Sequence, residues 1–254
     1  MVSATPIQGK PALLIRSKRS VLCIADLHIG YEMELRESGF NVPDQTGAML
    51  ASLIGIDEGD CLLILGDLKH SIPITREGES IRLSRFLRAL AERFSEVTMI
   101  AGNHDGAIGR FLPENVRFIP PGGTCISSIG LVHGHSWPSD IVMEAKTLVW
   151  GHLHPCVRLY DRLGASISMK CWLRGPAHPD ALGRRYEDIR TRESIVMPSF
   201  NPLLTGTPVN EKIKNRLSPF TRSGFVLLEE QHGYTLDGID LGEMSKLTKK
   251  RSKR

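Results

Sequence analysis

Side chains that can bind metal ions gather in five short clusters, each directly after an apolar run. The clusters are Asp26-Leu27-His28, Gly66-Asp67, Gly102-Asn103-His104-Asp105, His133-Gly134 and Gly151-His152-Leu153-His154. Imidazole and carboxylate groups suit manganese, iron or zinc, and the absence of thiolate argues against structural zinc. One Asp or His at such a place is ordinarily a turn former or a cap. Five clusters in order indicate a divalent-metal site.

The spacing within the clusters supports this interpretation. Asp26 and His28, like His152 and His154, are separated by one residue, so each pair can point to one side of an extended segment. Asp67 has two carboxylate oxygens and could bridge two ions. Ordinary core residues are the alternative, but burying four histidines and two aspartates with partners carries a large desolvation cost. We therefore expect one shared metal site.

The apolar runs before the clusters predict the elements that position them. These runs are Val21–Ala25, Cys61–Leu65, Val97–Ala101, Ile129–Val132 and Leu148–Trp150. Short apolar runs that end in Gly, Asp, Asn or His are typical of buried strands. In α/β folds, ligand sites collect at the carboxyl ends of such strands.

The remaining segments predict a mixed α/β core. Between the second and third runs, Glu79–Phe94 has apolar residues at helical spacing and predicts an amphipathic helix. Its arginine stripe is either a solvated face or a phosphate track. Further strand-like runs are Val157–Tyr160, Ile167–Leu173, Ile195–Phe200 and Phe225–Glu229, and a surface loop is expected over Gly175–Arg192. Two packed sheets fit this order better than a single doubly wound sheet.

Length and composition indicate one soluble domain. The 254 residues include 41% hydrophobic and 24% charged residues, as in ordinary globular proteins. No apolar stretch approaches the roughly 18 residues that a membrane span requires. The N-terminal segment lacks the apolar region of a secretory signal, so we expect a cytoplasmic protein without a membrane partner.

The net charge of +4 comes from the end of the chain, where residues 246–254 hold six of the 32 basic residues. The rest has 26 basic and 28 acidic residues. We expect one domain over residues 1–245 and a basic tail over 246–254. The tail is either solvated and disordered or a nucleic-acid arm.

The ordered motifs D-x-H, G-D, G-N-H-D, H-G and G-H-x-H over residues 20–155 resemble the calcineurin-like metallophosphoesterase superfamily. Longer sequence segments extend the resemblance to about residue 210: DLHIGYE, GDLKH, HGHSWP, GHLHP and MPSFNPLLTG. They resemble small prokaryotic phosphoesterases related to the SbcD-type nuclease subunit, some of which are associated with a DNA ligase or helicase. The resemblance implies an α/β protein with a four-layer α/β/β/α sandwich of two mixed sheets.

The resemblance also implies two divalent metal ions, with manganese expected first and iron, zinc or magnesium as alternatives. It implies that one ion is held by Asp26, His28, Asp67 and His154. It implies that the second is held by Asp67, Asn103, His133 and His152. Asp67 would bridge them.

Further histidines and an aspartate receive candidate roles, those of His104, Asp105 and the phosphate contact of His70 from the same resemblance. His104 matches the catalytic histidine and Asp105 the acid that would orient its imidazole. His104 would protonate the leaving alkoxide or stabilise the phosphoryl charge. His70 matches a histidine beside the substrate phosphate, or it makes a local hydrogen bond on its loop. His135 is either a partner of His133 or a loop residue.

The expected function is phosphodiester hydrolysis with two metal ions, acting on nucleic acid in a process related to DNA repair. The alternative is a phosphoesterase for small nucleotides or cyclic nucleotides. An inactive interaction scaffold is a third possibility, but such a scaffold would have lost metal ligands, and all seven are present. About 90 residues after Pro155 leave little room for the capping domain of the large SbcD-type nucleases, so specific processing of duplex ends is not implied.

Overall fold

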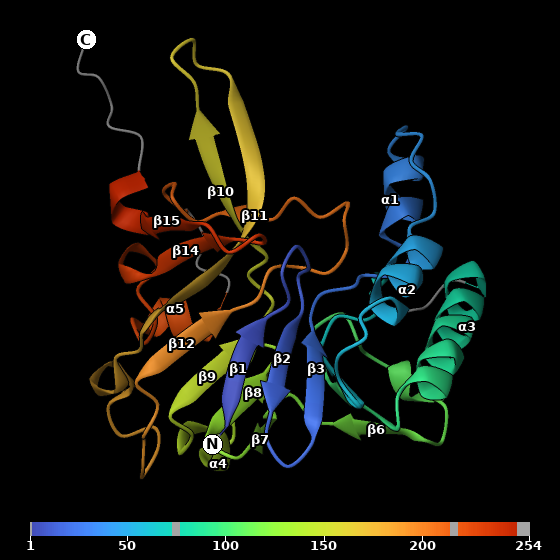
Figure 1. The fold of residues 1–254 in the computed structure, drawn as a ribbon, viewed down its shortest axis with the longest axis horizontal. Helices are drawn as coiled ribbons and strands as arrows, with labels where there is room; N and C mark the ends of the chain where they lie inside the picture. The colour runs from blue at the N-terminus through green and yellow to red at the C-terminus, as the bar shows by residue number, and fades with distance from the viewer. Residues whose placement is uncertain (1, 73–76, 214–217, 248–254) are drawn as a thin grey trace.

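The computed structural model describes residues 2–72, 77–213 and 218–247 (Figure 1). Within these residues, the first sheet has six strands in the order β1-β2-β3-β4-β5-β6. Its strands are β1 (Ser3–Pro6), β2 (Leu13–Arg16), β3 (Ser20–Ile24), β4 (Cys61–Leu65), β5 (Glu96–Ile100) and β6 (Val116–Ile119). Strands β3 to β6 are parallel, whereas β1 and β2 are antiparallel to their neighbours.

The second sheet contains the other nine strands of the described residues. They are β7 (Thr124–Ile126), β8 (Ile129–Val132), β9 (Thr147–Trp150), β10 (Pro155–Tyr160), β11 (Ser166–Pro176), β12 (Glu193–Val196), β13 (Thr207–Pro208), β14 (His232–Thr235) and β15 (Asp240–Glu243). Strands β8, β9 and β12 are parallel, and most other pairs are antiparallel. The β10–β11 hairpin extends away from the sheets (Figure 1).

Helices lie outside both sheets. They are α1 (Tyr31–Glu37), α2 (Thr46–Ile54), α3 (Glu77–Arg93), α4 (Asp140–Met143) and α5 (Pro219–Ser223). Short 3₁₀ helices are η1 (Ile108–Phe111), η2 (Pro179–Leu182), η3 (Leu228–Glu230) and η4 (Met244–Leu247). In Figure 1, α1, α2 and α3 lie on one side of the molecule and α5 on the other.

Three hydrophobic cores join the layers. One includes Leu83 of α3 and Ile64 of the first sheet, and another includes Phe220 of α5 and Trp150 of the second sheet. Between the sheets, residues such as Leu65 from β4 and Val149 from β9 form the third core. The layers are therefore helix, sheet, sheet and short helices. The predicted α/β/β/α sandwich of two mixed sheets is confirmed.

Most predicted elements are present, with small shifts at their ends. The five apolar runs coincide with β3, β4, β5, β8 and β9, and the amphipathic helix is α3. The run Ile195–Phe200 is strand only to Val196, because Pro198 removes a backbone donor soon afterwards. The prediction of a strand over Phe225–Glu229 is wrong. Phe225 and Val226 are buried in the outer core as irregular chain, and η3 follows.

The described chain ends within the expected basic tail, residues 246–254. Its first two residues, Lys246 and Leu247, belong to η4, and Leu247 packs against the outer core. Residues 248–254, the rest of that tail, lie outside the described residues. The single domain over residues 1–245 stays a prediction. Among the described residues, no helix combines the length and apolar character needed to cross a membrane.

Candidate metal centre

The five polar clusters meet where the parallel strands of both sheets end. Strands β3, β4 and β5 lead into the first three clusters, and β8 and β9 lead into the other two. Hydrogen bonds join neighbouring clusters: the His28 amide donates to the carbonyl oxygen of Asp67 over 2.8 Å, and the Gly151 amide to that of His133 over 2.9 Å. The two sheets are joined as well, because the His152 amide donates to the Asp26 carboxylate.

The candidate ligand atoms form three neighbouring groups. Two of them match the predicted ligand sets, and the third comprises His28, His70 and His104. The first comprises Asp26, His28 and His154, and the second comprises Asp67, His133 and His152. Within each group, one ligand atom per residue lies within 4.8 Å of the others. The Asn103 Oδ1 atom is 3.2 Å from Nε2 of His133, so Asn103 joins the second group. All seven predicted ligand residues are thus brought together.

Asp67 lies between the two groups. Its Oδ2 atom is 3.4 Å from Nε2 of His28 and 3.3 Å from Nε2 of His133. Its Oδ1 atom accepts a hydrogen bond from the His104 amide over 2.8 Å. One carboxylate oxygen is therefore held by the backbone, while the other faces both groups.

The hydrogen bonds of His133 define which of its nitrogens can bind a metal. Its Nδ1 atom is 2.8 Å from the carbonyl oxygen of Leu65. Because a carbonyl only accepts hydrogen bonds, Nδ1 carries a proton, so Nε2 is the nitrogen that can bind a metal once its own proton is lost. That atom points to Asp67 and Asn103.

Two further imidazole nitrogens lack hydrogen-bond partners, as expected for atoms that bind a cation. The Nε2 atoms of His28 and His154 are buried and make no hydrogen bond. Carboxylate oxygens lie only 3.4 Å and 3.1 Å from them, respectively. Buried polar atoms rarely stay unpaired, and each needs an explanation. Converging lone pairs and carboxylates are suited to a divalent cation, so these residues fit the metals that the fold implies.

The pKa values of the site residues also indicate a site for a cation. Although burial opposes protonation, the carboxylates of Asp67 and Asp26 raise the pKa of His133 to about 9. Burial and the neighbouring His133 hold the pKa of His152 at about 4. Despite their burial, the Asp67 and Asp26 carboxyls have lowered pKa values because histidines adjoin them. The buried carboxylates therefore attract positive charge into the cluster.

Backbone strain is concentrated in these ligands. Non-glycine residues with positive φ include Asp26 (58°), His28 (43°), Asp67 (52°), His152 (64°) and His154 (47°). The other two among the described residues are Ala107 and Ser127. A left-handed conformation costs such residues of the order of 1–2 kcal/mol each. Strain of this kind persists where the surroundings impose it, commonly at functional sites.

Glycines in two motifs allow the clusters to approach closely. A Cβ atom on Gly102 would lie 2.2 Å from the Asp67 carboxylate, and one on Gly151 would lie 2.7 Å from that of Asp26. No side chain fits at such distances, so glycine is required at both positions.

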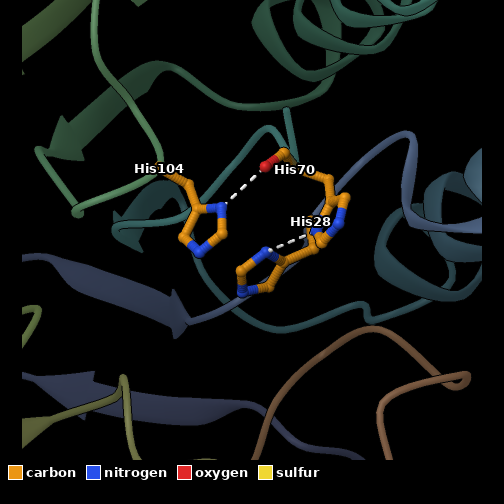
Figure 2. A group of neighbouring side chains, drawn as sticks. All are labelled: His28, His70 and His104. Atoms are coloured by element: carbon orange, nitrogen blue, oxygen red, sulfur yellow. Dashed lines mark hydrogen bonds between the residues drawn. The ribbon is translucent and has the colours of Figure 1, made fainter. Parts of the chain in front are cut away.

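His104 lies outside the two predicted ligand sets and forms the third group with His28 and His70 (Figure 2). Its Nδ1 atom donates to the carbonyl oxygen of His70 over 2.6 Å, which leaves Nε2 available. The rings of His104 and His70 stack with centroids 5.5 Å apart. His104 and His70, together with Ser71, Ile72 and Met33, line a cleft of about 450 Å³. Both residues therefore adjoin a space that a substrate could enter.

The hydrogen bonds of Asp105 differ from those expected. This buried carboxylate accepts from the backbone amides of Asp67 (2.7 Å), Leu68 (3.0 Å) and Gly102 (2.8 Å). The expectation that Asp105 orients the His104 imidazole is wrong in this structure, since the His70 carbonyl binds that ring. Asp105 instead joins the β4 and β5 loops. Burial and the charge of Asp67 raise its pKa to about 6.

Glu34 of α1 is a site residue that the sequence motifs do not indicate. Its Oε2 atom is 2.7 Å from Nε2 of His70, whose Nδ1 atom is 3.3 Å from Nδ1 of His28. If the carboxylate accepts from His70 Nε2, then His70 Nδ1 accepts from His28 Nδ1. That arrangement leaves the lone pair of His28 on Nε2, which faces the first group. His70 thus contacts a ligand as well as the cleft.

The two mixed sheets and this cluster define a metal-dependent phosphoesterase. Residues 19–150, more than half of the chain, match the family model described as calcineurin-like phosphoesterase, and the chain belongs to this family. His152 and His154 follow directly after the matched part. No curated protein matches the chain.

The chain is similar to solved structures. The crystal structure of Pseudomonas putida nuclease MPE is similar over 94% of this chain and 100% of its own, with 18% identity and a TM-score of 0.53. The phosphoesterase Yfce from E. coli is similar over 88% of this chain and 97% of its own, with 16% identity and a TM-score of 0.39. At these identities the likeness concerns the fold alone. The resemblance to SbcD-related proteins stays a prediction.

Proposed function

We propose that the protein is a dinuclear metal-dependent phosphodiesterase that acts on nucleic acid. The observation that carries the proposal is the position of Asp67, whose Oδ2 atom lies 3.4 Å from a histidine of the first group and 3.3 Å from one of the second. A carboxylate between two sets of imidazoles is suited to bridge two cations. Two such ions can activate a water molecule and stabilise the attacking and leaving oxygens of an in-line displacement.

The proposed ligand sets follow the two groups. Asp26, His28, Asp67 and His154 would hold the first ion, and Asp67, Asn103, His133 and His152 the second. The Nε2 atom of His104 is available at the cleft, where this residue would donate a proton to the leaving oxygen or stabilise phosphoryl charge. His70 would contact the substrate phosphate from the cleft wall. Asp105 would keep the β4 and β5 loops together.

A first prediction concerns the metal. Exhaustively chelated protein should lose turnover of a nitrophenyl phosphodiester and regain it when ions are added. Manganese should be at least as effective as magnesium, because imidazole-rich sites suit it better than they suit magnesium, which prefers oxygen ligands. Iron and zinc complete the comparison. Full turnover without added ion, with none detected by elemental analysis, would contradict the proposal.

The form of the cleft supports a polymeric substrate. Its wall includes Ile72, a residue that is 59% exposed, and Glu34, whose side chain is 62% exposed. An open cleft with basic flanks favours a polymer, whereas a lidded pocket favours a small ligand. The described residues that line this cleft include no lysine or arginine, so only its openness supports a polymer. The Pseudomonas putida protein of similar fold is described as a nuclease. A DNA-repair role, a ligase or helicase partner and a cytoplasmic location remain predictions from the sequence.

A substrate panel separates this proposal from the small-nucleotide alternative. With manganese, the protein would be given single- and double-stranded DNA and RNA, cyclic nucleotides, a nitrophenyl diester and a nitrophenyl monoester. Turnover of a nucleic acid at a kcat/KM well above that of the cyclic nucleotides is expected. The reverse order would assign the site to small nucleotides.

A second prediction concerns residues 248–254, which hold five basic side chains. If all five neutralise phosphates of duplex DNA, their deletion should reduce the slope of log K against log salt by at most about 4.5, from roughly 0.9 per contact. Binding titrations at several salt concentrations measure this slope. Turnover of a nitrophenyl diester, which has no nucleic-acid backbone for the tail to bind, serves as the control. An unchanged slope and affinity would leave the tail without a role in binding.

A further inference from the structure

The loop that follows β3 depends on a distant segment of the chain. This loop contains Asp26 and His28, both in the left-handed conformation, so it needs contacts that keep it strained. One side is held by the β4 loop, through the amide of His28 and the carbonyl oxygen of Asp67. The other side faces residues 197–202, which follow β12 and lie outside the part of the chain that matches the family model.

Asn201 makes the closest side-chain contact between this segment and the loop. Its Nδ2 atom donates to the carbonyl oxygens of Leu27 over 2.8 Å and His28 over 3.3 Å. Its Oδ1 atom accepts from the Leu203 amide over 2.9 Å. Asn201 is fully buried, and all of these partners have fixed roles as donor or acceptor. The amide therefore has one orientation, with both protons directed at the loop.

Backbone hydrogen bonds align the same two segments. The Phe200 amide donates to the carbonyl oxygen of Ala25 over 2.8 Å, and the Asn201 amide to that of Asp26 over 3.4 Å. With the side-chain bonds of Asn201, the carbonyls of four consecutive residues, 25 to 28, are bound by this segment.

Lys170 of β11 fixes the segment from another direction. Its Nζ atom donates to the carbonyl oxygen of Ser199 over 2.8 Å and also to that of Asn201. A partly buried ammonium that binds two carbonyls restrains the backbone around Asn201. The contacts thus run from Lys170 through Asn201 to the ligand loop.

We propose that Asn201, held by Lys170, is a positioning residue that keeps Asp26 and His28 in the geometry for binding the first metal ion. The inference rests on the proposed metal site and adds a residue to it. Without the amide, the Leu27 carbonyl loses its donor and the His28 carbonyl keeps only the Tyr31 amide. The loop can then relax from its left-handed conformation. The first ion should then bind more weakly, while ligands of the second ion keep their backbone supports.

Asn210 provides a matched control. It is also a buried asparagine, and its Nδ2 atom donates to the carbonyl oxygens of Arg158 over 2.8 Å and Leu247 over 3.2 Å. Its Oδ1 atom accepts from the Arg158 amide over 3.0 Å. Asn201→Ala and Asn210→Ala therefore remove the same kinds of bonds, but only the first touches the ligand loop.

The test is a manganese titration of metal-free protein, followed by the EPR signal of unbound Mn²⁺, with thermal unfolding measured in parallel. Asn201→Ala should weaken one of two binding steps by about 10- to 100-fold, as found for residues that support metal ligands, and leave the other within about threefold. Asn210→Ala should lose similar stability and keep both affinities. Lys170→Met leaves Asn201 in place and should weaken the same binding step by a smaller factor. This variant replaces Asn201→Ala in the test if Asn201→Ala does not fold.

The outcomes separate this inference from the function on which it rests. If the wild-type protein binds no pair of ions, the proposed dinuclear site fails. If the wild type binds two ions, and Asn201→Ala and Lys170→Met do so with unchanged affinities, Asn201 has only a structural role and the inference is overturned. Equal losses of affinity in Asn201→Ala and Asn210→Ala would overturn it too.

Discussion

Asp67→Asn is expected to lower kcat/KM for phosphodiesters by about 10³-fold or more. The Oδ2 atom of Asp67 faces both ligand groups, so the amide removes a negative charge from each proposed ion site. Bound ions contribute several kcal/mol of transition-state stabilisation, and each 1.36 kcal/mol corresponds to a factor of ten. The substitution is nearly isosteric, and an amide oxygen can still accept from the His104 amide. The fold should therefore persist.

Asp26→Asn is the comparison that tests the bridging role. Asp26 belongs to the first group only, so its substitution should weaken one ion and leave the other bound. Elemental analysis after gel filtration counts the ions in each variant. We expect two in the wild type, one in Asp26→Asn and fewer than one in Asp67→Asn. Two tightly bound ions in Asp67→Asn would show that Asp67 is not a bridge.

The sequence predicts the ligands well because each follows a strand whose residues carry a clear signal. The run Cys61–Leu65 is apolar throughout and matches β4 residue for residue. Gly66 then ends the strand, and Asp67 comes next. Where parallel strands end at one edge, the side chains after them must be neighbours, so their order along the chain suffices to group them.

Contacts between distant segments could not be predicted in this way. Asn201 binds a carbonyl 174 positions earlier in the chain, and no periodic pattern encodes that pairing. The sequence MPSFNPLLTG, which contains Asn201, indicates a role for this segment only through its resemblance to other proteins. Glu34 lies in α1, a helix of seven residues that is too short to give a periodic signal. Their roles depend on how the layers pack.

The case of Asp105 shows a different limit. Its residue type and place in the G-N-H-D motif predict a carboxylate near His104, but not which donors it accepts. In the folded chain, the amides of the β4 loop point at Asp105, and burial makes several backbone bonds to one carboxylate favourable. The carbonyl of His70 meets the His104 ring instead. Competition among neighbouring donors and acceptors decides such pairings.

His104→Asn is expected to keep both metal ions and to slow hydrolysis. His104 belongs to neither proposed ligand set, and its Nδ1 atom is bound to the His70 carbonyl. By contrast, His152→Asn or His154→Asn should weaken metal binding, since each belongs to one of the two groups. His178→Asn is a matched control, because His178 pairs with Glu230 and belongs to neither group. It should leave activity and metal content unchanged.

The size of the loss should depend on the leaving group. If Nε2 of His104 donates a proton to the leaving oxygen, the loss on a nucleic-acid diester should be of the order of 10² to 10⁴, because a sugar alkoxide leaves poorly without a proton. A nitrophenyl diester releases a stable phenolate that needs little protonation, so its hydrolysis should slow much less. Single-turnover rates of both substrates, measured with saturating manganese, provide the comparison. Equal losses would indicate that the imidazole stabilises phosphoryl charge instead. Loss of bound metal in this variant would make His104 a ligand and contradict its place in the proposed mechanism.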